Sequence, residues 1–213
     1  MPDVLLAVIT GVPLTLAVTV VAMALGTVLA LPLLGLSLSP FAPLRGLSRA
    51  IIDLIRGVPI VVWLFILYFG LDFGDFKLSS FGAAVLGLGI ISAAYLSEVF
   101  RGAVGSVNVG QFEASRALGM TDFDTWKSIV APQAWRVAIP GYTTYGIGLL
   151  KDSSIASTIG VAEIVFLSNN YARSGGDGLT VFALAGLVYV LISIPVGLLS
   201  RVADEKLSAV VAK

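Results

Sequence analysis

The residues most able to do chemistry in this chain are opposite charges placed close together in apolar surroundings. Lys151 and Asp152 are adjacent and lead into hydroxyl side chains that begin with Ser153. Such a pair can contact the carboxylate and the ammonium group of a zwitterion, or it can anchor a helix end at a membrane boundary. The sequence leaves both readings open. Glu98 and Arg101 lie one helical turn apart, and there an internal ion pair is favoured over contact with a solute.

The composition excludes several other kinds of chemistry. The chain has no cysteine and no histidine, which rules out disulfides, thiol or imidazole catalysis and most transition-metal sites. It also lacks the phosphate-binding pattern Gly-x-x-x-x-Gly-Lys-Ser/Thr, so ATP hydrolysis would have to occur in another chain. We therefore expect no enzyme activity, no metal, no cofactor and no nucleic-acid partner for this chain itself.

These charges lie in a chain whose composition suits a lipid bilayer. Of its 213 residues, 57% are hydrophobic and 12% are charged, which is about half the charged fraction of a soluble domain. Uncharged apolar runs of about 18 residues or more predict membrane-spanning helices. We expect a single all-α integral membrane domain, 1–213, with about five spans, at roughly 10–36, 52–71, 78–101, 124–150 and 178–202.

Two parts of this plan are less defined. The run from Val4 to Leu44 is longer than one span needs, and Pro13 and Pro32 are candidates for a bend or a boundary within it. Its length and the lack of a preceding basic residue favour a retained span over a signal peptide. The segment 151–178 is expected either as a surface loop or with its apolar half, 155–166, re-entering the membrane or packed as a short helix.

The distribution of basic residues predicts the orientation. With the amino terminus outside and five spans, ten of the 13 Lys and Arg residues fall inside and three fall outside. The inside set is Arg45, Arg49, Arg56, Arg101, Arg116, Lys127, Arg136, Arg201, Lys206 and Lys213, and the outside set is Lys77, Lys151 and Arg173. Because cytoplasmic loops are rich in Lys and Arg, the carboxyl terminus is expected in the cytoplasm.

A polar interruption between the third and fourth expected spans, roughly 109–119, has the signature of a rigid helix. Glu113 and Arg116 are spaced to pair on one face. Gly119 suits a left-handed helix end, and Thr121 with Asp124 resembles a capping box that starts the next helix. On these grounds alone, a connector resting on lipid headgroups explains the segment at least as well as a docking role.

The same segment resembles the EAA loop of ABC importer permeases. The match consists of Glu113-Ala114-Ser115, Gly119 and Ile129-Val130-Ala131-Pro132 at the family's spacing, with Ser115 and Ala131 as small departures. In that family this loop is a coupling helix that docks on the ATP-hydrolysing subunit. The resemblance implies that Glu113, Ala114 and Gly119 dock there, with Phe112 and Leu118 as apolar contacts.

Three further stretches resemble the polar amino acid uptake branch of these permeases. They are Ile55-Arg56-Gly57-Val58-Pro59-Ile60, Ala94-Tyr95-Leu96-Ser97-Glu98-Val99-Phe100-Arg101-Gly102 and Leu150-Lys151-Asp152-Ser153-Ser154-Ile155-Ala156-Ser157. The resemblance implies a type I ABC importer fold and a solute path near the third and fourth spans. Tyr95, Glu98, Thr144, Lys151, Asp152 and Ser153 are the candidates to line it.

The resemblance also implies partners and a location. We expect two ATP-binding subunits, in which ATP–Mg would bind, a second copy or a homologous permease, and an extracytoplasmic binding protein that delivers a polar amino acid or similar zwitterion. The membrane would be the bacterial cytoplasmic (inner) membrane. An ion-gradient-driven secondary carrier is the alternative, but such carriers often contain two related halves, and the sequence shows no second copy.

Overall fold

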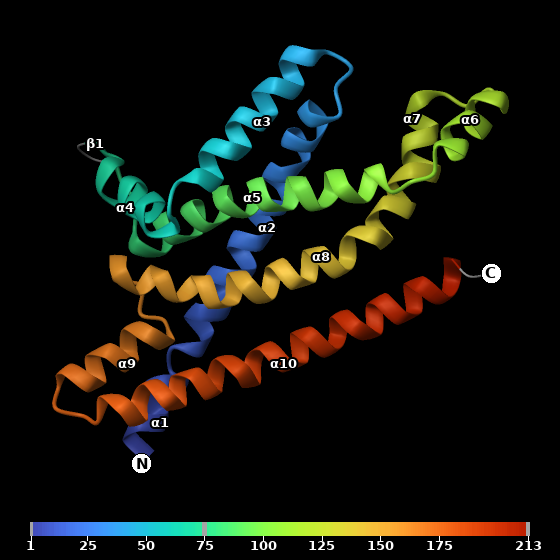
Figure 1. Ribbon diagram of the computed structural model, residues 1–213. Helices are drawn as coiled ribbons and strands as arrows, with labels where there is room; N and C mark the ends of the chain where they lie inside the picture. Colours follow the sequence, from blue (N-terminus) through green and yellow to red (C-terminus); the bar gives the residue numbers. More distant parts are fainter. Residues whose placement is uncertain (1, 74–75, 212–213) are drawn as a thin grey trace.

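The computed structural model describes residues 2–73 and 76–211, which form a bundle of helices (Figure 1). The elements are α1 (Pro2–Ile9), α2 (Val12–Ser37), α3 (Ala42–Gly57), α4 (Ile60–Gly70), β1 (Asp72–Phe73), β2 (Phe76–Lys77), α5 (Ser80–Gly105), α6 (Val109–Ala117), α7 (Asp122–Thr125), the π-helical turn η1 (Trp126–Val130), α8 (Ala131–Asp152), the 3₁₀ helix η2 (Ser153–Ile159), α9 (Ile164–Arg173) and α10 (Gly178–Val211). Apart from the small antiparallel hairpin β1–β2, the described part of the chain is helical, as predicted.

Helix α5 is the centre of the bundle and contacts α2, α3, α4 and α8. Small residues allow α2 to cross it closely, since a Cβ atom added to Gly26 would lie 2.2 Å from the Cβ atom of Ser92. Leu88 of α5 packs with Leu64 and Leu149 on one part of the core, and Phe100 packs with neighbours from α2 and α8 on another. The backbone of α5 is thereby fixed on several sides.

The first apolar run is divided into two helices. Pro13 lies in the first turn of α2, where its missing N–H has no intrahelical partner to lose. It therefore marks a boundary, whereas Pro32 lies inside α2 without ending it. Gly11 occupies the break, and a Cβ atom there would lie 2.5 Å from the backbone nitrogen of Ile164. The turn between α1 and α2 thus passes directly against the start of α9.

The second expected span differs most from its prediction. Instead of one helix over 52–71, α3 begins ten residues earlier, at Ala42, and is followed by α4 at an angle of 94°. The break falls at Val58 and Pro59, because the residue before a proline is driven out of the helical region. Val58 is accordingly extended, with φ −101° and ψ 132°. A continuous apolar run concealed this break in the sequence.

Three described segments are long and apolar enough to cross a membrane, namely Val4–Ser37, Ser80–Gly105 and Gly178–Leu198, and the bent pair α3–α4 would make a fourth. Helix α8 is not among them, so five spans remain a prediction. In Figure 1, α6, α7 and the carboxyl-terminal end of α10 lie at one end of the bundle, and the amino terminus, α9 and β1 lie toward the other. An odd number of crossings would place the termini in this way. Lys213, one of the basic residues assigned to the inside, lies outside the described residues.

The segment between α8 and α10 is largely helical. It consists of η2, a left-handed turn at Gly160 with φ 87°, and α9, which packs on α1 and α10. The apolar stretch 155–166 contains most of η2 and the first residues of α9, both packed on neighbouring helices, in agreement with the expected packed helix, whereas re-entry into the membrane stays a prediction. Glu163 is the first residue before α9 and is fully buried. Its carboxylate accepts hydrogen bonds from the backbone N–H groups of Val165 and Phe166 and from the Tyr189 hydroxyl, at 2.7–2.9 Å.

We expect Glu163→Ala to destabilise the bundle by about 2–4 kcal/mol, because it leaves two N–H groups of the first turn and a buried hydroxyl without their acceptor. The measurement is the thermal unfolding midpoint of the purified protein in detergent. Burial raises the pKa of Glu163 above its usual 4.5, so the folded state holds its proton to higher pH than the unfolded state. Stability should therefore fall as pH rises from 4.5 through the raised pKa.

The matched control is Glu163→Gln, which keeps a side-chain oxygen as acceptor and removes the charge. Its midpoint should fall by less than half as much as that of the alanine variant. Because glutamine does not titrate, the part of the pH dependence of the unfolding midpoint that Glu163 causes should disappear over the same pH range. A glutamine variant as unstable as the alanine variant would show that a neutral side-chain oxygen cannot replace the carboxylate cap.

Candidate functional site

The segment predicted as a rigid helix is α6, and its start is fixed by the side chain of Asn108, which the predicted motif did not include. Asn108 is extended, and its Oδ1 atom accepts a hydrogen bond from the backbone N–H of Gly110 at 2.8 Å. Asparagine is a preferred residue at this position because it satisfies a free N–H of the first turn. The signal available in the sequence was that an asparagine directly precedes Val109, the first residue of the predicted helix.

The end of α6 has the predicted glycine stop. Gly119 is left-handed, with φ 70°, its N–H donates to the carbonyl of Arg116, and the N–H of Met120 donates to the carbonyl of Ser115, both at 3.0 Å. These two bonds form a Schellman motif, which closes the free carbonyls of a helix end. The chain then turns directly into α7.

The capped start of the next helix is also present. The hydroxyl of Thr121 accepts from the backbone N–H of Asp124 at 3.1 Å and donates to the Asp124 carboxylate at 2.6 Å. Beyond α7, the π-helical turn η1 carries the chain into α8, whose first turn contains Pro132. Helices α6 to α8 are thus joined without a flexible loop, and we call α6 and α7 together the lever.

The lever presents its candidate docking residues outward. Glu113, Ala114 and Gly119 are exposed, Leu118 is 78% exposed and Phe112 is half-buried. Ser115 points the other way, since it is buried and its hydroxyl donates to the carbonyl of Phe112 at 2.9 Å. The small third residue of the motif is therefore packed inside the protein rather than presented on the surface of the lever.

Two features of the lever differ from the sequence-based picture. Glu113 and Arg116 form no ion pair with each other, nor with any other described residue, so the predicted pairing is wrong in this structure. The exposed apolar surface also extends beyond the motif, because Val109 is 68% and Phe123 is 72% exposed. The Lys127 ammonium lies 5.9 Å from the centre of the Phe123 ring. Phe123 carried no signal beyond being apolar in a polar segment.

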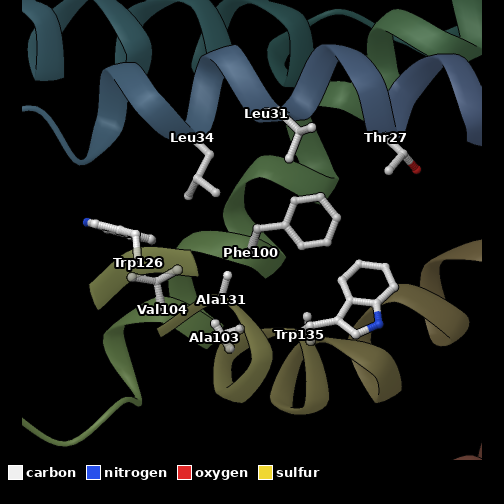
Figure 2. Close-up of a pocket in the computed structure, with 11 residues that line it drawn as sticks. Thr27, Leu31, Leu34, Phe100, Ala103, Val104, Trp126, Ala131 and Trp135 are labelled. Atoms are coloured by element: carbon white, nitrogen blue, oxygen red, sulfur yellow. The ribbon is translucent and has the colours of Figure 1, made fainter. Parts of the chain in front are cut away.

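An apolar cavity of about 260 Å³ lies where η1 and α8 meet α2 and α5. Figure 2 shows Leu31 and Leu34 of α2 facing Phe100 of α5 across it, with Trp126 and Trp135 at its two sides. Its lining is mostly apolar, and its polar side-chain groups are the Thr27 hydroxyl and the indole N–H groups of Trp126 and Trp135. Such a cavity is unsuited to a polar or charged solute.

A second, polar hollow of about 420 Å³ lies between the end of α2, α3 and α5. It is lined by Ser37, Leu38, Arg49, Ile52, Asp53, Arg56, Glu98, Arg101, Val104 and Gly105. Arg101 donates two hydrogen bonds to the Glu98 carboxylate, at 2.6 and 3.0 Å. The favoured ion pair is therefore present, although its residues also face the hollow.

Aromatic rings connect this hollow to α8. The Arg56 guanidinium lies 4.7 Å from the centre of the Tyr95 ring. Tyr95 stacks on Tyr145 of α8 at 5.5 Å between ring centres, and the Tyr145 hydroxyl donates to Ser92 at 2.9 Å. Helices α3, α5 and α8 thus meet in one stack beside the hollow. The sequence indicated Tyr95 but neither of its partners.

The other candidate solute contacts do not line the hollow. Thr144 is exposed on α8, Lys151 is exposed, and Asp152 is half-buried. Ser153 is fully buried, and its hydroxyl donates to the carbonyl of Leu150 at 2.7 Å. Lys151 borders a separate hollow against α10, with Tyr189 and Ser193. Among the described residues, no group of three or more acidic side chains could hold a metal ion.

Comparison with known proteins gives a consistent family. Residues 22–209 match the family described as the binding-protein-dependent transport system inner membrane component. Two relatives from Bacillus subtilis (strain 168) are the probable amino-acid ABC transporter permease protein YckA, 35% identical over 93% of this chain and 88% of its own, and the probable amino-acid permease protein YxeN, 36% identical over 94% and 91%.

A solved structure agrees with these relatives. A chain in the crystal structure of an amino acid ABC transporter with histidines has a TM-score of 0.86, is 28% identical, and aligns over 94% of both chains. The fold and the family thus agree over nearly the whole length. The chain therefore belongs to the inner membrane components of binding-protein-dependent transport systems and is a multi-pass permease subunit of an ATP-driven ABC importer rather than a secondary carrier.

Proposed function

We propose that this permease imports a polar amino acid or a related small zwitterion and that the lever couples it to ATP hydrolysis. The permease would act as a pair, with a second copy or a homologous permease. Two ATP-binding subunits, in which ATP–Mg binds, would dock on the cytoplasmic side, and a binding protein would deliver the solute outside. The amino-acid relatives support the solute class.

The observation that carries the coupling role is the surface of the lever. Glu113 forms no ion pair with any described residue, and the lever also exposes apolar side chains at Leu118 and Phe123. Side chains cap the starts of both helices of the lever, at Asn108 and Thr121. Exposed apolar groups with a few charges are typical of surfaces that a partner covers. We assign docking to Phe112, Glu113, Ala114, Leu118 and Gly119, as the motif implies, and add Phe123.

The connections of the lever suggest how movement would spread. A displacement of α6 would pass through α7 and η1 to α8, because these elements follow one another along the chain with only the short turn at Leu118–Thr121 between α6 and α7. Helix α8 holds Tyr145, which stacks on Tyr95 of α5. Motion of the lever would therefore change the geometry beside the polar hollow. This route requires no nucleotide site in the permease.

We further propose that the amino terminus lies outside, that the lever and the carboxyl terminus lie in the cytoplasm, and that Tyr95 and Glu98 lie on the solute path. Their proximity to the polar hollow supports this assignment. Thr144, Lys151, Asp152 and Ser153 remain predicted contacts, and the position of Lys151 against α10 favours the anchoring alternative for that residue.

The test is isolation of the tagged chain from native membranes in mild detergent, with the co-isolated proteins identified by mass spectrometry. We expect an ATP-binding subunit in a one-to-one ratio with total permease, and a second permease only if the pair is heteromeric. A lever variant with Leu118→Asp and Phe123→Asp is the control and should lose the ATP-binding subunit. Retention of that subunit by the variant would contradict the docking role.

A further inference from the structure

The break between α3 and α4 places charged residues next to backbone that is not helical. Helix α3 carries Asp53 and Arg56 in its last two turns, and α4 starts after Pro59 at 94° to it. Within membranes, interrupted helices are tolerated where they are buried in protein or line a polar cavity. In transporters, such interruptions often form the solute site. Here Asp53 and Arg56 line the polar hollow described above.

The break is braced by a side chain from α4. The indole N–H of Trp63 donates to the carbonyl of Ile55 at 3.0 Å, one of the carbonyls that the end of α3 leaves without an intrahelical partner. Trp63 also packs on the cluster formed by Ile52, Ile55, Ile91 and Ala94. The last turn of α3 is thereby fixed relative to α5, and with it the position from which Arg56 extends.

Arg56 has an aromatic neighbour but no carboxylate partner. Its guanidinium lies over the Tyr95 ring, and no described carboxylate lies within the 4.0 Å of an ion pair. The nearby Glu98 is occupied by two hydrogen bonds from Arg101. Asp53, one turn before Arg56, likewise has no ion-pair partner in the described chain. The hollow therefore contains one anion of α3, Asp53, with Arg49 one turn before it and Arg56 one turn after it, and none of the three is in an ion pair with a described residue. Of the two cations, Arg56 is the one held over an aromatic ring.

We propose that this hollow is the receptor for the two charged groups of an α-amino acid, with Arg56 binding the carboxylate and Asp53 the ammonium group. The planar guanidinium binds a carboxylate through two parallel hydrogen bonds. Residues three apart on a helix have Cβ atoms about 5–6 Å apart, close enough to contact both groups on one carbon atom. This assignment rests on the proposed function, since it names how its solute class is recognised.

The size and neighbours of the hollow fit this assignment. Its volume of about 420 Å³ lies within the range of about 300–1,000 Å³ found for small-molecule sites. Arg56 and Asp53 would contact only the carboxylate and ammonium groups that all α-amino acids share. The receptor would therefore accept many amino acids, and selection among them would depend on contacts with the side chain of the ligand. Arg56 lies over the Tyr95 ring, and Tyr95 stacks on Tyr145 of α8. A movement of Arg56 on binding the solute would therefore be passed to α8 through these two rings.

The test is uptake of the twenty common L-amino acids, each radiolabelled, into proteoliposomes that hold the complete importer and saturating binding protein. The variants Arg56→Gln and Asp53→Asn are compared with Arg49→Gln, which removes a cation from the same helix and the same hollow. For the best substrate of the wild type, we expect Arg56→Gln and Asp53→Asn each to lower the maximal rate about tenfold or more. Arg49→Gln should lower it less than about fivefold.

Two measurements keep the outcomes distinct. The first is co-purification of the ATP-binding subunit, which shows that each variant assembles. The second is the uptake rate of Arg56→Lys, which keeps the charge without the planar guanidinium and should have a maximal rate between those of the wild type and Arg56→Gln. Unchanged uptake by Arg56→Gln, or an equal loss with Arg49→Gln, would overturn the receptor while leaving the importer function intact. A wild-type importer that moves none of the amino acids would overturn the proposed solute class and the receptor with it.

Discussion

Replacing Glu113 with lysine is expected to leave the permease folded in the membrane and to reduce ATP-driven uptake by about tenfold or more, because a reversed charge in a docked interface costs several kcal/mol. The structure separates docking from stability at this position. Glu113 is exposed and has no ion-pair partner among the described residues, so its loss removes no internal contact. The measurement is uptake into vesicles together with the rate of ATP hydrolysis by the isolated complex.

The control is Asp122→Lys, which makes the same charge reversal on an exposed acid at the start of α7. If a specific contact of Glu113 matters, Asp122→Lys should keep most of the uptake. Equal losses in both variants would mean that any positive charge on the lever interferes with docking, and the role of Glu113 would then be electrostatic and general. Normal uptake by Glu113→Lys would remove Glu113 from the interface.

The sequence predicted the lever well because its geometry is determined by neighbouring residues. Gly119 and Thr121 specify where one helix ends and the next begins, and both act within a few residues of their own position. The Glu98–Arg101 pair forms as its spacing of one helical turn allows. The same spacing between Glu113 and Arg116 gives no ion pair, so spacing specifies helix ends and caps more firmly than it specifies ion pairs.

The polar hollow was not predictable, because its residues meet only through packing. Arg56 contacts Tyr95, and Tyr95 contacts Tyr145, across three helices separated by dozens of residues. The break at Pro59 was not predicted either, because the apolar run around it resembled one continuous span. Nothing in the sequence places the Glu163 carboxylate against Tyr189, because the two residues lie 26 positions apart and meet only through packing.

The packing of α2 on α5 supports the second prediction of large effect. We expect Gly26→Ala to destabilise the protein by about 1–3 kcal/mol or more, because the interior has no room for an added methyl group. The new Cβ atom would lie 2.2 Å from the Cβ atom of Ser92 and 3.0 Å from the carbonyl oxygen of Gly89. Neither is the end of a flexible side chain, so the two helices must move apart. The measurement is the thermal unfolding midpoint in detergent.

Gly35→Ala is the matched control, because Gly35 lies on the same helix and a Cβ atom there meets nothing within 4 Å. An alanine at that position should be neutral or slightly stabilising, since it replaces glycine within a helix at a gain of about 0.5–1 kcal/mol. Equal midpoints for the two variants would show that α2 and α5 can separate without cost.

Gly26→Ala should also reduce uptake, because the added methyl group meets Ser92, which an alanine at Gly35 does not reach. Ser92, the residue struck by the added methyl group, accepts the hydrogen bond from Tyr145 that orients the stack beneath Arg56. Displacing Ser92 would shift Tyr145, then Tyr95, and so the wall of the polar hollow. If the uptake rate of Gly26→Ala falls by a larger factor than the amount of folded protein in the membrane, the α2–α5 contact acts on the hollow through Tyr145 and Tyr95. If uptake instead follows the amount of folded protein in the membrane, the contact between α2 and α5 contributes only stability.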